Sequence, residues 1–274
     1  MEMMKTSSVF DEYKFIELIG RGGNAEVWKA QHVFTKHMVA IKITKNQSAC
    51  KDIVKEFTAL MKFDSINIVR PDVFFYKSKA NAFMIMQLYE EDLFSYIEKR
   101  DRLDEKTLQK IARDVCSAIK LLHDADFVHR DIKPENVFMD GNTCVLGDFG
   151  GVEHIDNMTI DRIVGTSSFL APEVVLGVIR RDEAVFTLGK PVDVYALGQT
   201  LYLAATKQHA VAPTSSIRKI VRTVAEVDME PLIDALDRSE DFKDLLRGLV
   251  EYHAIKRLTI DEVIGHSFMN RHFV

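Results

Sequence analysis

The hydrophobic pattern of the N-terminal third of the chain predicts several strands and one helix. Stretches rich in aromatic and β-branched residues end at glycines or polar turns, which is typical of strands. They predict strands over residues 13–19, 27–30, 38–43, 73–76 and 82–88. Between the third and the fourth strand, apolar residues recur at helical spacing and predict a helix over 51–63.

Beyond residue 90 the pattern becomes helical. Apolar stripes and runs predict helices over 108–122, 193–206 and 242–252. Asp104 is a suitable N-cap for the first of these helices, and Pro191 precedes the second. Thr259 and Glu262 have the spacing of a capping box, which predicts a last helix near Val263. The change from strands to helices predicts two lobes, with a hinge at 87–90.

The composition agrees with a soluble, two-lobed body. The 274 residues exceed what one hydrophobic core usually serves. The net charge of −5 argues against nucleic acid as the main partner, because binding to phosphates requires a basic surface. No run approaches the length of about 18 apolar residues that suggests a membrane span. We therefore expect neither a nucleic-acid nor a membrane partner, and we expect a monomer.

The cysteines and the first residues bear on localisation. Cys50, Cys116 and Cys144 are odd in number and widely spaced, which argues against a disulfide framework and a zinc site. A reducing compartment, cytoplasmic or nuclear, is the expected environment. The N-terminal residues lack the apolar run of a signal peptide, and Glu2 stands where myristoylation requires a glycine.

One stretch carries most of the candidate chemistry. It reads His129-Arg130-Asp131-Ile132-Lys133-Pro134-Glu135-Asn136, and Asp148-Phe149-Gly150 follows twelve residues after it. An Asp and an Asn five positions apart, with a second Asp after the next short strand, can converge on a phosphate and its metal ions. Three more motifs stand around this stretch, namely Gly20-Arg21-Gly22-Gly23-Asn24-Ala25-Glu26-Val27, Val39-Ala40-Ile41-Lys42 and Ala171-Pro172-Glu173.

In these motifs and their order, the chain resembles the eukaryotic protein kinase family from about Tyr13 to its last residues. The resemblance implies an α+β, bilobal kinase fold, with a short N-terminal extension at 1–12 and a kinase domain at 13–274. The β-rich N-lobe would take about 13–88 and the helical C-lobe about 89–274. It also implies transfer of the ATP γ-phosphoryl group to Ser or Thr hydroxyls of protein substrates. Lys133 together with Thr166 resembles the serine/threonine kinases.

The resemblance assigns nucleotide-binding roles. Lys42 would contact the α- and β-phosphates and pair with Glu56, whereas each charge alone would be read as a solvated surface group. Ala25 departs from the family pattern, because it takes the place of the third glycine. The other nucleotide contacts implied by position are Ile19, Gly20, Gly22, Val27, Ala40, the gatekeeper Met86, Gln87, Tyr89, Phe138 and Asp148.

The resemblance likewise assigns the catalytic and metal-binding roles. Asp131 would be the catalytic base for the substrate hydroxyl, Lys133 would neutralise charge on the transferring phosphoryl group, and Thr166 would complete this group. Asn136 and Asp148 would hold Mg²⁺, because carboxylate and carbonyl oxygens suit a hard ion.

Three further residues are predicted to be architectural. Glu173 would form a buried ion pair with Arg257, and Asp193 would brace the catalytic loop from its helix. The segment 186–198 resembles the calcium/calmodulin-dependent protein kinase kinases, which is our subfamily prediction.

Two other functions compete with a protein kinase. A pseudokinase would bind ATP or a partner without transfer and predicts loss of Lys42, Asp131, Asn136 or Asp148, but all four are present. A small-molecule kinase of the aminoglycoside-phosphotransferase kind should lack the Ala171-Pro172-Glu173 motif and the helix Asp, and both are present.

The acidic residues near the hinge suggest a substrate preference. Glu90, Glu91 and Asp92, together with Glu135, would favour Arg or Lys N-terminal to the phosphoacceptor through charge-assisted hydrogen bonds. The alternative is that Asp92 binds the ribose and the other carboxylates are solvated.

The activation loop suggests a kinase that does not need loop phosphorylation. Arg162 stands at the usual acceptor position, and Thr159 is the nearest hydroxyl. We predict that Arg130 is held by Glu153 or by a nearby acid such as Asp161, with Arg162 free to pair with either acid, so that the loop is ordered without a phosphate. The alternative is that Thr159 is phosphorylated and recruits Arg162.

Overall fold

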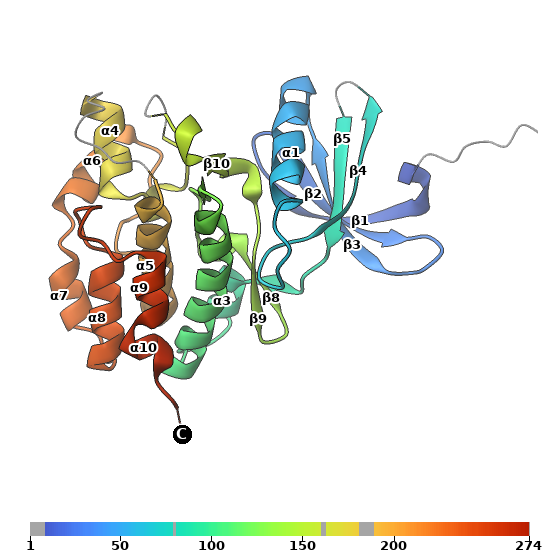
Figure 1. The fold of residues 1–274 in the computed structure, drawn as a ribbon. Helices are drawn as coiled ribbons and strands as arrows, with labels where there is room; N and C mark the ends of the chain where they lie inside the picture. The colour runs from blue at the N-terminus through green and yellow to red at the C-terminus, as the bar shows by residue number, and fades with distance from the viewer. Residues whose placement is uncertain (1–8, 79–80, 160–162, 181–188, 274) are drawn as a thin grey trace, which may run out of the picture. The chain divides into compact units, whose positions relative to one another are not determined.

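The computed structural model describes residues 9–78, 81–159, 163–180 and 189–273, and the chain divides into two compact units (Figure 1). The first unit comprises Met1–Asp64 and Ile68–Tyr89, and the second comprises Ser65–Asn67 and Glu90–Val274. The first contains a five-stranded antiparallel sheet, and the second is mainly helical. The predicted α+β class, with a β-rich unit followed by a mainly helical one, is confirmed.

The strands of the first unit form a sheet of order β1-β2-β3-β5-β4. Their bounds are β1 Tyr13–Arg21, β2 Ala25–His32, β3 Met38–Thr44, β4 Pro71–Ser78 and β5 Asn81–Gln87. All five predicted strands are confirmed, with ends that differ by at most two residues.

In strand β3, side chains that pack in the core and side chains predicted to bind the nucleotide lie on opposite faces of the sheet. Val39 and Ile41 join a hydrophobic cluster that also contains Ala30, Phe83 and Ile85. Because successive side chains of a strand point to opposite faces, Ala40 and Lys42 lie on the other face. The alternation along β3 therefore turns Lys42 away from the cluster.

Helix α1 (Gln47–Leu60) packs on β3, β4 and β5. It begins four residues before the predicted start at residue 51, because the side chain of Asn46 caps it by accepting a hydrogen bond from the Ala49 amide at 3.0 Å. It also ends at Leu60, three residues before the predicted end.

The described part of the second unit holds helices α2 to α10 and five short strands. The helices are α2 Leu93–Glu98, α3 Glu105–Asp124, α4 Pro172–Arg180, α5 Pro191–Thr206, α6 Ile217–Glu226, α7 Met229–Asp234, α8 Glu240–Leu249, α9 Ile260–Gly265 and α10 Ser267–Asn270. The strands are β6 Glu91–Asp92, β7 Phe127–Val128, β8 Val137–Asp140, β9 Thr143–Leu146 and β10 Glu153–His154. They pair as β6-β8-β9 and β10-β7. None of the described helices combines the length and apolar character needed to cross a bilayer.

Helix α5 lies at the centre of the second unit and contacts α3 and α8 (Figure 1). It starts at Pro191 itself, two residues before the predicted start, since a proline is well suited to the first turn of a helix. A Cβ on Gly198 would lie 2.6 Å from the Val250 side chain, so only glycine permits this approach of α5 to α8.

The local signals at two other helix ends are confirmed, and one prediction is wrong. The Asp104 side chain caps α3 by accepting the Thr107 amide at 2.8 Å. Thr259 and Glu262 form the predicted capping box at the start of α9. However, α9 is not the last helix, because α10 follows it after a break at His266, which caps α10.

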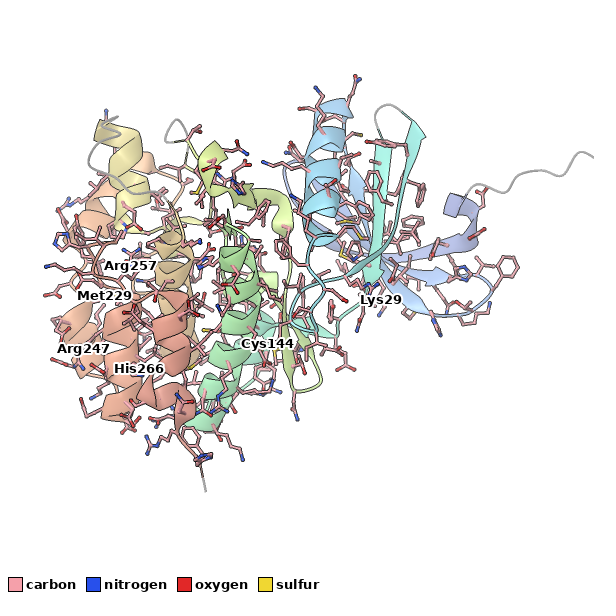
Figure 2. All side chains as sticks on the ribbon, viewed as in Figure 1. Lys29, Cys144, Met229, Arg247, Arg257 and His266 are labelled. Carbon is pink, nitrogen blue, oxygen red and sulfur yellow. The ribbon has the colours of Figure 1, made fainter. Side chains whose placement is uncertain are left out.

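A buried ion pair joins the start of α4 to Arg257, which lies before α9 and is labelled in Figure 2. Arg257 Nη1 donates to Glu173 Oε1 at 2.6 Å, and Nη2 donates to Oε2 at 3.0 Å. Arg257 also donates to the carbonyl of Pro191 at 2.8 Å. The predicted Glu173–Arg257 bridge is therefore present, and it also reaches the start of α5.

Candidate active site

One face of the sheet in the first unit gathers most of the predicted nucleotide-binding residues. Directly paired residues of antiparallel strands share a face, and the register places Gly20 opposite Val27, Val27 opposite Lys42, and Lys42 opposite Met84. The next row on the same face pairs Ala40 with Met86. These residues come from four strands, so the sheet register alone aligns them.

The remaining predicted residues of the first unit lie beside this face or at the end of the unit. Ile19 precedes Gly20 on β1 and is 46% exposed. Gln87 is the last residue of β5, and Tyr89 is the last residue of the unit.

Lys42 and Glu56 form the predicted ion pair. Lys42 Nζ lies 2.7 Å from each carboxylate oxygen of Glu56, and the Glu56 side chain is only 5% exposed. A buried carboxylate requires a partner, and this bidentate arrangement holds the Lys42 ammonium in one place. Glu56 is thus not a solvated helix charge.

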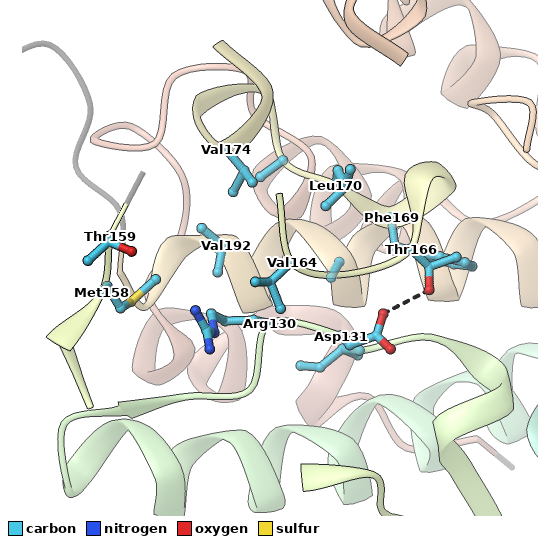
Figure 3. A pocket seen from close by; sticks show the side chains of 13 residues that line it. Arg130, Asp131, Met158, Thr159, Val164, Thr166, Phe169, Leu170, Val174 and Val192 are labelled. Atoms are coloured by element: carbon cyan, nitrogen blue, oxygen red, sulfur yellow. Dashed lines mark hydrogen bonds between the residues drawn. The ribbon is translucent and has the colours of Figure 1, made fainter. Parts of the chain in front are cut away.

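Three side chains of the second unit converge at the catalytic loop. Lys133 Nζ donates to Asp131 Oδ2 at 2.9 Å and to Thr166 Oγ1 at 2.7 Å. The Thr166 hydroxyl donates in turn to Asp131 Oδ1 at 2.8 Å (Figure 3). Both carboxylate oxygens of Asp131 are therefore held by donors, which fix the orientation of a candidate general base.

Asn136 and Asp148 are brought together by the short sheet that follows the loop. Asn136 Nδ2 donates to the carbonyl of Asp131 at 2.7 Å and to its Oδ2 at 3.1 Å. The amide of Gly147, just before Asp148, donates to the Asn136 carbonyl at 2.8 Å. Because Asn136 uses its amide nitrogen on Asp131, its Oδ1 is the atom suited to a cation. An oxygen pair of this kind fits Mg²⁺.

The backbone at this site adopts unusual conformations. Arg130 and Asp148 have φ of 72° and 54°, in the left-handed region that most side chains avoid. Such conformations persist where the surroundings hold them, and they often occur at functional sites. His129 supplies part of that support, since its Nε2 lies 3.0 Å from the Gly147 carbonyl and its ring packs edge-on against Phe149.

Asp193 braces the catalytic loop, as predicted. Its carboxylate accepts the amides of His129 and Arg130, each at 2.8 Å, and a hydrogen bond from His123 Nε2 at 3.0 Å. Burial opposes ionisation of this carboxyl, but the donors from His123 and the loop more than offset it, so the pKa of Asp193 lies below its usual range.

A pocket that is partly open to solvent adjoins Asp131 and Thr166 (Figure 3). Its walls are mainly apolar, with Val164, Leu170 and Val174 among them, and Thr159 lies at the end away from Thr166. Sequence motifs did not single out these apolar residues. Met84 was also missed, although its position two residues before Met86 on one strand could have indicated it.

Two of the four acidic residues proposed to select basic substrates already have other partners. Glu91 pairs with Lys99 at 2.9 Å, and Asp92 caps α2 by accepting the Ser95 amide at 2.7 Å. Glu90 and Glu135 are exposed. Phe138 lies on β8 directly opposite Asp92 of β6.

Some predicted features lie outside the described residues. Asp161 and Arg162 are among these, as are residues 181–188, which include the first part of the segment 186–198.

Comparison with known proteins identifies the family. A family model described as the protein kinase domain matches residues 13–269. A probable serine/threonine-protein kinase of Dictyostelium discoideum is 30% identical over 275 residues, covering 94% of this chain and 38% of that protein. The phosphorylase b kinase gamma catalytic chain, liver/testis isoform, of Bos taurus is 29% identical over 281 residues, covering 96% of this chain and 67% of that protein.

A third relative is testis-specific serine/threonine-protein kinase 2 of Mus musculus, 29% identical over 268 residues, which cover 92% of this chain and 71% of that protein. The chain thus spans from 38% to 71% of the lengths of these relatives. The family model covers nearly the whole sequence and includes every motif described above. The chain therefore carries a protein kinase domain of the serine/threonine type and belongs to the eukaryotic protein kinase superfamily.

Proposed function

We propose that the protein transfers the γ-phosphoryl group of ATP to serine and threonine hydroxyls of protein substrates. The observation that carries this proposal is the Thr166 hydroxyl, which bridges Lys133 and Asp131 within 2.8 Å of each. A threonine in contact with both the candidate base and the candidate phosphoryl-binding lysine suits a serine/threonine kinase. The serine/threonine kinases among the relatives support the same activity.

In this proposal Asp131 orients the substrate hydroxyl and accepts its proton as the phosphoryl group is transferred. Lys133 stands beside Asp131, so its ammonium can offset the negative charge that develops on the transferred group. The hydroxyl of Thr166 holds both side chains in one arrangement before the substrate arrives. Preorganisation of this kind lowers the barrier, because the groups need not be ordered during the reaction.

Nucleotide and metal are assigned to residues that fit them. Lys42, fixed by Glu56, would contact the α- and β-phosphates. Asn136 Oδ1 and the Asp148 carboxylate would hold Mg²⁺, which when bound neutralises charge on the phosphate oxygens. Asn136 additionally ties this metal site to the catalytic base through its hydrogen bond to Asp131.

The experiment follows ³²P from ATP into a pool of proteins for the wild type and Asp131→Asn. We expect transfer by the wild type and its loss in the variant, with ATP binding retained in both. Asp140→Asn, the same change at the exposed last residue of β8, is the matched control and should keep transfer. Binding of ATP without transfer by the wild type would instead indicate a pseudokinase.

The substrate preference that we propose is for Arg or Lys N-terminal to the phosphoacceptor, carried by the exposed carboxylates Glu90 and Glu135. Glu91 and Asp92 contribute less, since other groups engage them. A Ser/Thr peptide array should show faster phosphorylation of peptides with basic residues at those positions, and Glu90→Gln/Glu135→Gln should flatten the preference. Equal rates for basic and acidic peptides with the wild type would exclude this preference.

A further inference from the structure

The glycine-rich loop of the first unit is tied to residues outside it by two side chains. Asn24, near the tip of the loop, donates from Nδ2 to Oδ2 of Asp52 on α1 at 3.0 Å. Lys45, just after β3, donates from Nζ to the carbonyl of Gly22 at 2.6 Å. These contacts lie entirely within one compact unit. The loop is therefore joined to a helix and to the end of a strand as well as to its own hairpin.

Asp52 lies on the same side of α1 as the buried carboxylate of Glu56. The two residues are four apart, so their side chains lie one above the other on the helix. Glu56 binds Lys42 of β3, and Asp52 binds Asn24 of the loop. Helix α1 thus reaches the nucleotide-binding face at two points one turn apart, through a buried ion pair and an exposed hydrogen bond.

The backbone of the loop is already ordered up to the point of this contact. The Gly22 amide donates to the Ala25 carbonyl at 2.9 Å, and the Lys45 amide donates to the Asn24 carbonyl at 3.0 Å. Ala25, which replaces the third glycine of the family pattern, begins β2 and pairs with Thr44. Because a Cβ narrows the accessible backbone conformations, Ala25 shortens the freely moving part of the loop. The Asn24 side chain then fixes its tip.

We propose that Asp52 is a positioning residue for the nucleotide, which couples the position of α1 to the glycine-rich loop through Asn24. This inference rests on the proposed ATP-dependent function and specifies how its nucleotide site is held. When α1 is in the place that joins Glu56 to Lys42, Asp52 would hold the glycine-rich loop in position to receive the nucleotide phosphates. By reciprocity, a nucleotide that orders the loop also stabilises this position of α1.

The test compares Asp52→Ala, Asn24→Ala and the double variant in the full chain, with ATP and Mg²⁺ as the probe. Titration calorimetry measures the dissociation constant of ATP, and hydrogen exchange of the apo protein measures the opening of the loop amides. Each single variant should weaken ATP binding about two- to tenfold, the range expected for loss of one hydrogen bond, and should speed exchange at residues 22–26. The double variant should be no weaker than the single variants, because both remove the same contact.

Two controls separate the hydrogen bond from charge and from general damage. Asp52→Asn removes the charge but keeps an acceptor oxygen, so it should bind ATP within about twofold of the wild type. Lys51→Ala changes an exposed neighbour on the same helix and should leave both ATP binding and loop exchange unchanged.

Additive effects of the two single variants, or no effect on loop exchange, would overturn the proposal. Equal weakening by Asp52→Asn and Asp52→Ala would also overturn it, because the charge of Asp52 would then be the cause. If the wild type binds no ATP, the proposed function fails, and the exchange data of the apo protein still decide whether the contact holds the loop.

Discussion

Arg130 forms an ion pair with Glu153 beside the candidate catalytic base. Arg130 Nη2 lies 3.7 Å from Glu153 Oε2, and the two side chains are 12% and 16% exposed. Arg130 Nε also donates to the carbonyl of Gly151 at 2.6 Å. The predicted pairing of Arg130 with Glu153 is therefore present. The carboxylate of Glu153 thus pairs with the arginine that directly precedes the candidate base Asp131.

From this pair we predict that activity does not require a phosphate on the activation loop. A phosphate near Arg130 would be repelled by the negative charge of Glu153. Pairing with Arg130 would therefore stabilise a phosphorylated loop less than it would without Glu153. Protein made in bacteria and treated with phosphatase should keep its activity within about twofold, as should Thr159→Ala. Glu153→Gln should lower kcat by up to about tenfold, since Arg130 loses a charged partner. A large loss in the phosphatase-treated wild type would show that the loop needs its phosphate.

Thr166→Val should lower kcat about 10- to 100-fold, because it removes the hydroxyl that links Lys133 to Asp131 while keeping the branched shape. Thr166→Ser retains the hydroxyl and should stay near the wild-type kcat. Steady-state kinetics with one peptide substrate provide the measurement. Equal kcat for the valine variant and the wild type would contradict a role for this hydroxyl.

Asp193→Asn should reduce stability at neutral pH by about 3 kcal/mol, because a buried amide cannot accept all the donors that surround this carboxylate. The pKa of Asp193 is lowered in the folded protein, so its ionised form stabilises the fold fully above the unfolded value, about pH 4, and progressively less as the pH falls below it. Urea unfolding of the wild type and variant across this range should show the gap narrowing in acid. A gap that does not change with pH would contradict the prediction.

Arg257→Met should destabilise the protein by about 3–5 kcal/mol, since it leaves the buried Glu173 carboxylate without its partner. The matched control is Arg222→Met on α6, where the pair with Glu226 is 76% and 62% exposed. That change should alter the free energy of unfolding by no more than about 0.5 kcal/mol. Denaturant unfolding measures both, and similar effects of the two substitutions would count against a structural role for Arg257.

The cysteines should react with thiol reagents only after unfolding. Cys50, Cys116 and Cys144 are all buried and free (Figure 2 labels Cys144). Burial raises the pKa of the Cys144 thiol to about 12 and also raises the pKa of Cys116, so neither is ionised at neutral pH. A colorimetric thiol assay should detect no fast reaction in the native protein and all 3 thiols after denaturation. Fast labelling of the native protein would show an accessible thiolate.

The sequence alone determined the strands, several helix ends and the family of this protein. These features depend on residues close together in the chain or on the order in which motifs occur. The alternation in β3 separates Lys42 from the hydrophobic cluster, and it is visible in four consecutive residues. The caps at Asp104 and Thr259 act on amides three residues away. Motifs in a fixed order likewise indicate the family without reference to any contact.

Other features were decided by the tertiary structure. The sequence left Arg130 with Glu153 or a nearby acid such as Asp161 as partner. The pairing of β10 with β7 carries Glu153 to within 3.7 Å of Arg130, whereas Asp161 lies outside the described residues. Glu91 was predicted to select substrates, but helix α2 brings Lys99, the residue after its end, within 2.9 Å of Glu91. Asp52 reaches Asn24, 28 residues away.

These contacts share a physical reason for being hidden in the sequence. Each joins polar side chains that stand apart in the sequence, and the chain offers several other polar groups with which each could pair. A single hydrogen bond or exposed ion pair contributes only about 1 kcal/mol, too little to choose among them. The choice is made by the packing of strands and helices. Their buried apolar faces contribute far more to the free energy of folding than a single polar contact, and their arrangement determines which polar side chains meet.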